Sequence, residues 1–220
     1  MLADGPFPPG DGISVKTEEN HLTPGWQAGV AVLLAVLAWS ASLVVGDFAF
    51  DDRHAIHENP AVAGGLSVAE AFRRDYWHHV GDAGHYRPLA TLSLRLDHAI
   101  HGEAAWGYHL TNVLLHAAVV GVLAFVLLRR PGPTRGAFLG LCVFAVHPVL
   151  GDSVAWISGR TSMVSALGGV AAIAVVAAGR RLPLILTGVT LGLLAALLGK
   201  EDGIVFVLPV LLLAAWRSRT

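Results

Sequence analysis

Two adjacent aspartates, Asp51 and Asp52, follow the first long apolar run of the chain, where a membrane-spanning helix would leave the bilayer. Neighbouring carboxylates repel each other, and partial desolvation beside hydrocarbon adds to the cost of keeping both charged. A carboxylate in such a place is suited to take a proton from a hydroxyl group. Asp51 and Asp52 are therefore candidate catalytic bases. The alternative is that they end a helix and remain in water.

Two later polar segments, and Arg87 in the stretch between the first two apolar runs, carry groups that would complement such a base. Asp152 follows the third apolar run, Arg160 precedes the fourth, and Lys200 follows the fifth. A third carboxylate could support the first two, and arginine or lysine could neutralise a phosphate. The sequence predicts Asp152 as a catalytic residue, and Arg160, Arg87 and Lys200 as donor-phosphate ligands. The alternative for Arg160 is a side chain that snorkels from a polar turn.

A third group of polar residues lies within or beside the apolar runs. His109, Asn112 and His116 are spaced at about one helical turn and would share one helix face. Packing and ligand contact are equally compatible with that spacing. The candidate pocket residues are His109, Asn112, His116, His147 and Glu201.

Histidines in the segment after the first run could bind a divalent metal together with the carboxylates. None of their spacings matches a strong metal motif, so we predict no metal ligands and no cofactor. The formal net charge of −1 gives no reason to expect nucleic-acid binding.

The elements that position these residues are apolar helices. Hydrophobic residues make up 54% of the chain and charged residues 14%, against about 25% charged in ordinary soluble domains. Runs of this length and polarity predict an all-α membrane protein with about six transmembrane helices. The runs cover residues 26–46, 107–128, 136–151, 161–179, 182–199 and 203–216, the last being short and containing a proline.

Arginines alternate between the short loops and predict the orientation. Loops on one side carry Arg129, Arg130, Arg135, Arg180, Arg181, Arg217 and Arg219. Basic loops stay in the cytoplasm, so the N-terminus is predicted to be cytoplasmic and residues 47–106 to form a long outer loop. Residues 1–25 are expected to be a disordered cytoplasmic tail, 26–216 the membrane domain, and 217–220 a second tail. The arginine- and alanine-rich composition suggests a bacterial inner membrane.

The outer loop is predicted to contain two short interfacial helices. Ser67 and Glu70 have the spacing of a capping box, which would open a helix running towards Trp77. Pro88 suits a first helical turn, and Gly102 suits the end of the helix that follows.

Several motifs, taken in order, resemble the transmembrane and tetratricopeptide-repeat O-mannosyltransferases and their bacterial relatives among the GT-C glycosyltransferases. The motifs are Phe50-Asp51-Asp52, Tyr76-Trp77, Tyr86-Arg87-Pro88-Leu89, Gly107-Tyr108-His109-Leu110-Thr111-Asn112-Val113-Leu114-Leu115-His116, Phe144-Ala145-Val146-His147-Pro148-Val149, Val154-Ala155-Trp156-Ile157-Ser158-Gly159-Arg160 and Lys200-Glu201-Asp202-Gly203-Ile204. The resemblance covers roughly residues 26–216, and it implies a partial GT-C-like fold.

The resemblance also implies an activity. An enzyme of this kind transfers a sugar, here mannose, with inversion from a polyprenyl- or dolichyl-phosphate donor to a hydroxyl of a protein or glycan outside the cytosol. Asp51 or Asp52 would be the base. The acidic position after the His-Pro motif falls on Asp152, and the phosphate role falls on Arg160, Arg87 or Lys200.

The chain departs from the family pattern in two ways. Ser162 stands where family members commonly have an acidic residue, and the family continues with further spans and tetratricopeptide repeats. A partner chain could supply those parts. A non-catalytic or truncated membrane subunit is therefore the alternative function, and a small transporter is a third.

Overall fold

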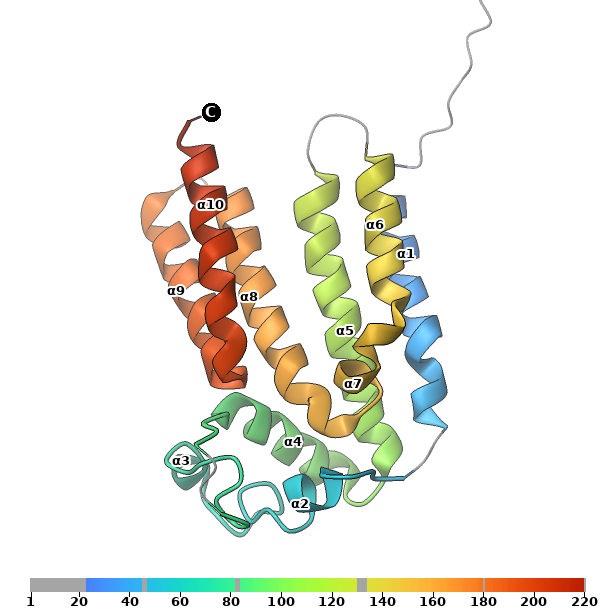
Figure 1. Cartoon of the computed structure of the whole chain (residues 1–220), viewed down its shortest axis with the longest axis vertical. Helices are drawn as coiled ribbons and strands as arrows, with labels where there is room; N and C mark the ends of the chain where they lie inside the picture. Colours follow the sequence, from blue (N-terminus) through green and yellow to red (C-terminus); the bar gives the residue numbers. More distant parts are fainter. Residues whose placement is uncertain (1–22, 45–46, 82–83, 130–133, 180, 220) are drawn as a thin grey trace, which may run out of the picture.

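The computed structural model describes residues 23–44, 47–81, 84–129, 134–179 and 181–219. These residues form helices and turns, and no strand occurs among them. The long helices stand side by side, and the segment between the first two crosses one end of the bundle (Figure 1). The all-α membrane fold is thus confirmed. The predicted tail lies mostly outside the described residues, as do Arg130 and Arg180 of the orientation argument.

Four helical segments are long and apolar enough to cross a membrane, or five if one bent pair is a single span. The four segments are α1 Pro24–Trp39 continued by η1 Ser40–Leu43, α5 Ala105–Leu128, α8 Arg160–Ala178 preceded by η3 Ile157–Gly159, and α9 Leu182–Gly199. The last predicted run instead forms η4 Glu201–Phe206 and α10 Val207–Arg217. With 11 residues, α10 falls short of a span.

The bent pair replaces the third predicted run. α6 Arg135–Val146 ends before Pro148, and η2 Pro148–Leu150 and α7 Gly151–Val154 continue at an angle of 45°. Proline disfavours the helical conformation of the preceding residue, and His147 is accordingly extended. The break turns α7 across the end of the bundle, which places Asp152 there.

Small residues set the distance between α8 and α9. A Cβ atom on Gly168 would lie 2.6 Å from the Ala196 nitrogen, and one on Gly192 would lie 2.9 Å from the Gly168 oxygen. The backbones therefore touch, as is typical of helices packed within a membrane.

The segment between η1 and α5, here named the outer segment after its predicted location, contains three short helices: α2 Asp52–Ile56, α3 Val68–Ala71 and α4 Pro88–His101. The capping box is present, since Ser67 and Glu70 each accept a hydrogen bond from the other's backbone. However, α3 ends at Ala71 and does not run towards Trp77. The predicted start of α4 at Pro88 and its end at Gly102 are confirmed, and Gly102 has a φ of 56°.

α4 lies over the end of the bundle. Leu94 is fully buried on its inner face, whereas Leu96 and Ile100 are 61% and 64% exposed. Leu94 packs with Ile56, Tyr76 and Ile157 in one core that joins the outer segment to the bundle.

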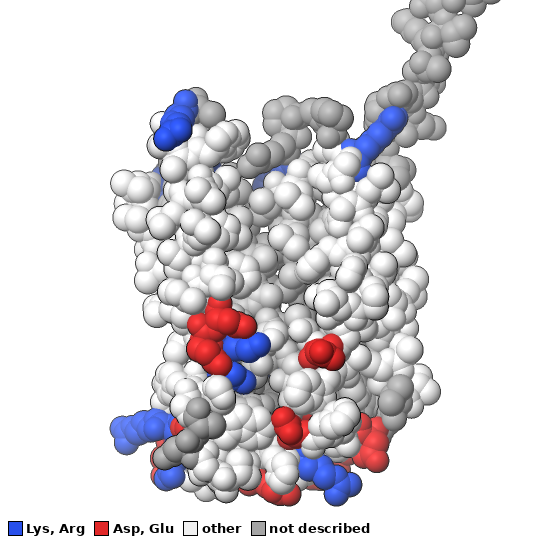
Figure 2. Space-filling view, viewed as in Figure 1, with Lys and Arg blue, Asp and Glu red and all other residues white. Residues whose placement is uncertain are grey.

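Charged side chains separate to the two ends of the molecule. On the face in Figure 2, acidic and basic groups gather around the end that carries the outer segment, the opposite end shows basic groups, and the surface between shows neither. This pattern suits a multi-pass membrane protein. The predicted orientation stays a prediction.

Candidate active site

Two adjoining cavities lie where the outer segment meets the bundle. Cavity A has a volume of about 360 Å³ and cavity B about 600 Å³, and Asp51, Asp152 and Trp156 line both. Cavity A is lined by Asp51, Tyr76, Trp77, Arg87, Asp152, Ser153, Trp156, Ser158, Gly159, Thr161, Ser162 and Lys200. The structure thus brings together two predicted catalytic carboxylates and two predicted phosphate ligands from four separate parts of the chain.

Asp51 and Asp52 have different surroundings. Asp52 is 1% exposed, and its Oδ1 accepts hydrogen bonds from the backbone and hydroxyl of Ser158, at 2.8 and 2.6 Å. Its Oδ2 accepts from the Ala49 N–H at 3.0 Å. Asp51 precedes α2, is exposed and lines both cavities, whereas Asp52 lines only cavity B. Asp52 therefore fastens the first loop to η3, and Asp51 is the carboxylate open to a ligand.

Asp152 lies in the first turn of α7, and its exposed side chain lines both cavities beside Trp156. Trp156 also donates from its indole N–H to the Ala49 carbonyl at 3.4 Å. α7 and the first loop are joined at this point, which sets Asp152 and Asp51 on the walls of the same cavities.

Arg87 presents a guanidinium group to cavity A. Its Nε and Nη2 donate to both carboxylate oxygens of Glu201, at 2.8 and 2.5 Å. This hydrogen-bonded pairing lowers the pKa of Glu201 to about 2. The pair joins the start of α4 to η4 and fixes the direction of the guanidinium. The predicted pocket residue Glu201 is therefore a partner of Arg87 and does not itself line either cavity.

Lys200 reaches cavity A from the end of α9. Its Nζ donates to the Ser162 hydroxyl at 3.1 Å and lies 3.1 Å from Asp202. Ser162 thus contacts the ammonium group as a neutral partner. With only one carboxylate among the described residues, that of Asp202, beside it, the ammonium group of Lys200 attracts an anionic ligand more strongly than it would beside two carboxylates.

Tyr76 closes cavity A from the outer segment. It is 2% exposed, its hydroxyl has no hydrogen-bond partner among the described residues, and Arg87 stacks 5.8 Å from its ring centroid. Burial raises the pKa of Tyr76. A neutral, buried and unpartnered hydroxyl on a cavity wall is available to hydrogen-bond a ligand.

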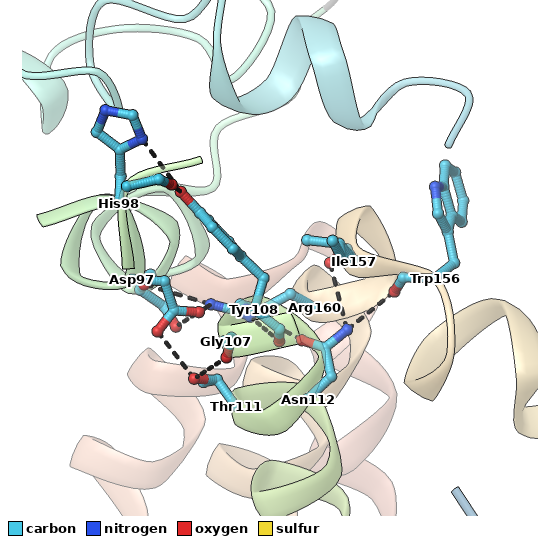
Figure 3. Close-up of polar contacts among 11 residues, drawn as sticks. Asp97, His98, Gly107, Tyr108, Thr111, Asn112, Trp156, Ile157 and Arg160 are labelled. Atoms are coloured by element: carbon cyan, nitrogen blue, oxygen red, sulfur yellow. Dashed lines mark hydrogen bonds and ion pairs between the residues drawn. The ribbon is translucent and has the colours of Figure 1, made fainter. Parts of the chain in front are cut away.

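Arg160 does not reach the cavities. Its side chain is fully buried and forms an ion pair with Asp97 of α4. Arg160 also donates to the Asn112 Oδ1 at 2.8 Å and the Tyr108 carbonyl at 2.6 Å (Figure 3). With these acceptors around it, the guanidinium joins α4, α5 and α8, and the geometry does not support its predicted role in binding phosphate.

The four remaining pocket candidates lie in different places. Asn112 belongs to the Arg160 network and also donates to the Trp156 carbonyl at 2.9 Å. His116 is buried inside the bundle, with Nε2 2.9 Å from the Ala145 carbonyl. His147 is exposed and accepts from the Val149 N–H at 3.2 Å at the helix break. Of the four, His109 alone is among the residues lining a described cavity, which is cavity B.

Within the described ranges, no group of three or more His, Cys, Asp or Glu side chains is arranged to hold a metal ion. The site residues that sequence reasoning missed are Tyr76 and Trp156 on the cavity walls and Asp97 in the Arg160 network. Tyr76 and Trp156 stand in motifs that were recognised, but nothing in those motifs distinguished a cavity wall from a core position.

The fold and the cavities define the chain as a multi-pass helical membrane protein with a charged site at one end of its bundle. The chain is homologous to curated protein O-mannosyl-transferases, and the resemblance predicted from its motifs is confirmed.

Three relatives illustrate the extent of the match. Protein O-mannosyl-transferase TMTC2 of Mus musculus is 38% identical over 135 residues, which are 60% of this chain and 16% of that protein. Tmtc1 of Drosophila melanogaster is 36% identical over 157 residues, 69% of this chain and 18% of the relative. TMTC1 of Mus musculus is 38% identical over 149 residues, which are 64% of this chain and 16% of that protein. The chain thus matches less than a fifth of each of these relatives. No protein-family model and no solved structure matches it.

Proposed function

We propose that this chain transfers a mannosyl group from a polyprenyl- or dolichyl-phosphate donor to a hydroxyl of an acceptor protein on the non-cytoplasmic side of the membrane. The observation that carries the proposal is the composition of cavity A, where Asp51 and Asp152 lie with Arg87 and Lys200. The names of the relatives support mannosyl transfer to protein. The two cations on the wall of cavity A support a phosphate in the donor, and its lipid part is what the family resemblance implies.

The four charged residues that line cavity A each have a role in this reaction. The acceptor oxygen attacks the anomeric carbon from the face opposite the phosphate, and its proton passes to the Asp51 carboxylate. The bond between that carbon and the phosphate oxygen breaks, and its electron pair leaves with the lipid phosphate. Arg87 and Lys200 offset the charge that grows on this phosphate. Asp152 stabilises the positive charge that develops on the sugar ring.

Arg160 receives a different role from the one its sequence position suggested. Its network connects α4 to α5 and α8, and Ser158, which holds Asp52, lies two residues before it. Arg160 is thus a positioning residue that keeps the outer segment against the bundle. The proposal assigns the phosphate to Arg87 and Lys200 alone.

The proposed setting is a bacterial inner membrane, with the cavities outward and the lipid chain of the donor in the bilayer. The proposal includes a partner chain that carries further spans or tetratricopeptide repeats.

Transfer from a polyprenyl-phosphate mannose to a peptide tests the proposal with Asp51→Asn and Asp52→Asn. Asp51→Asn should lower kcat by about 10²-fold or more, as expected for loss of a general base, and should leave the unfolding temperature unchanged. Asp52→Asn should mainly lower the unfolding temperature. Its –NH2 group is a donor, and it would replace the carboxylate oxygen that accepts the hydrogen bond of the Ala49 N–H. Glu58→Gln, which changes an exposed carboxylate that lines neither cavity A nor cavity B, serves as the matched control.

Wild-type transfer rates with Asp51→Asn would remove the base assignment. Failure of the wild-type chain to transfer from any lipid-phosphate sugar would favour the alternative, a non-catalytic membrane subunit.

A further inference from the structure

Cavity B, the larger of the two, is not needed to bind the donor phosphate. It lies between the first loop, α5 and α7, and its walls include the apolar groups of Ala49, Phe50, Ala155 and Trp156. It adjoins cavity A at Asp51, Asp152 and Trp156. A molecule in cavity B would therefore meet the proposed base from the side away from Arg87 and Lys200.

The two cavities differ in net charge, because the lining of cavity A balances two carboxylates with Arg87 and Lys200. The described lining of cavity B contains four carboxylates, on Asp47, Asp51, Asp52 and Asp152, and no lysine or arginine. A phosphate would be repelled there, whereas cavity A offers it two cations. The difference sorts ligands by charge: an anionic donor is directed to cavity A, and a neutral or cationic molecule to cavity B.

A buried histidine on the wall of cavity B favours binding of a polar molecule there. His109 is 5% exposed, and neither of its ring nitrogens has a hydrogen-bond partner in the described structure. The backbone of Ala155 lies near the ring without forming a hydrogen bond of normal geometry. Buried polar atoms are seldom left unpaired, so a polar group of a bound molecule would complete the surroundings of this side chain.

Phe50 adds an apolar contact at the rim. It precedes Asp51, is 89% exposed and has a φ of 49°. This left-handed conformation is unfavourable for a bulky residue and is typical of functional loops. The ring is available to pack against an apolar side chain of a ligand whose hydroxyl reaches Asp51.

We propose that cavity B binds the acceptor polypeptide and selects segments whose residues around the reacting hydroxyl are apolar or basic and are not acidic. The inference rests on the proposed function, because it assigns the second substrate of that reaction. Asp47 and Asp152 attract basic flanking residues, His109 hydrogen-bonds the peptide, and Phe50 packs against it.

The test compares three peptides that share one threonine and differ only in two flanking positions, which are Lys, Gln or Glu. KM and kcat are measured for transfer from polyprenyl-phosphate mannose to each. The KM of the Glu peptide should exceed that of the Lys peptide by about tenfold, from exposed charge pairs that each contribute a few-fold. The ratio should shrink as salt rises from about 0.05 to about 0.5 M, because screening weakens such pairs.

Two variants locate the effect. Asp47→Asn should reduce the ratio between the KM values of the Glu and Lys peptides about threefold. Glu58→Gln is the matched control, because Glu58 shares a third cavity with Asp47 but does not line cavity B. An equal reduction by Glu58→Gln would show that the effect does not arise in cavity B.

A binding measurement separates failure of this inference from failure of the proposed function. Fluorescent forms of the three peptides are titrated with the detergent-solubilised chain, and their anisotropy is followed without any donor. Tighter binding of the Lys peptide, weakened by Asp47→Asn, supports the acceptor site even if no transfer occurs. Equal affinity for all three peptides overturns it, even if transfer to the Gln peptide proceeds normally.

Discussion

The ion pair between Arg160 and Asp97 provides the sharpest test of how this site is built. Arg160→Met would leave the Asp97 carboxylate buried, with the Thr111 hydroxyl at 2.8 Å as its remaining described hydrogen-bond donor. It would also remove the donors to Asn112 and the Tyr108 carbonyl. Breaking a buried pair by removing one partner costs about 3–5 kcal/mol, so we expect Arg160→Met to lower the free energy of unfolding by that amount.

A double-mutant cycle distinguishes the ion pair from general packing. Asp97→Asn should also be strongly destabilising, because the guanidinium would be buried without a counter-charge. The double variant should cost less than the sum of the single changes by about 2 kcal/mol, because neither buried charge is then left alone. Unfolding is followed by circular dichroism in detergent micelles, and Arg53→Met, an exposed arginine in the same segment, is the control.

The same variants decide between a positioning role and phosphate binding for Arg160. If it positions the outer segment, the double variant should show the expected coupling of about 2 kcal/mol and should bind the lipid-phosphate donor with a KM near that of the wild type. Additive costs in the cycle would refute the ion-pair reasoning. If Arg160→Met had normal stability and a greatly raised KM for the donor, the result would support a phosphate-binding role for this arginine.

Two further changes test other contacts. Glu201→Gln should destabilise the protein by about 1 kcal/mol at pH 7, a value reduced for the exposure of this pair with Arg87. Because the pKa of Glu201 is lowered from its ordinary 4.5 to about 2, this contribution is complete above about pH 4.5 and declines as the pH falls towards 2; a constant difference in unfolding temperature across that range would contradict it. Gly168→Ala should destabilise by about 1–3 kcal/mol because its Cβ would strike the backbone of α9, whereas Gly140→Ala, where nothing lies within 4 Å, should have little effect. Equal unfolding temperatures for the two alanine variants would count against close packing of α8 and α9.

Local signals in the sequence predicted the elements whose boundaries depend on neighbouring residues. The capping box at Ser67, the start at Pro88 and the end at Gly102 are of this kind. The same reasoning extended α3 too far. Asp75 accepts a hydrogen bond from the Trp77 N–H at 2.7 Å and forms a turn of its own, and such side-chain bonds compete with helix formation.

The candidate site was predictable to the extent that topology alone decides it. Each span crosses the membrane, so every second loop returns to the same side, and residues 51, 87, 152 and 200 could be expected near one another; they line one cavity. Burial is a different matter. Arg160 and Asp97 are 63 positions apart, and no local pattern shows that α4 lies over the start of α8. Without that packing, a buried arginine and a phosphate-binding arginine look alike in the sequence.

The geometry of a helix start explains how two adjacent carboxylates can serve different ends. Asp52 is the first residue of α2 and Asp51 precedes it, and successive helical residues point about 100° apart. When Asp52 turns inward to accept the hydrogen bonds of Ser158 and Ala49, Asp51 must point elsewhere, and it lines cavity A. The proposal of Asp51 as the base follows from the way Asp52 is held.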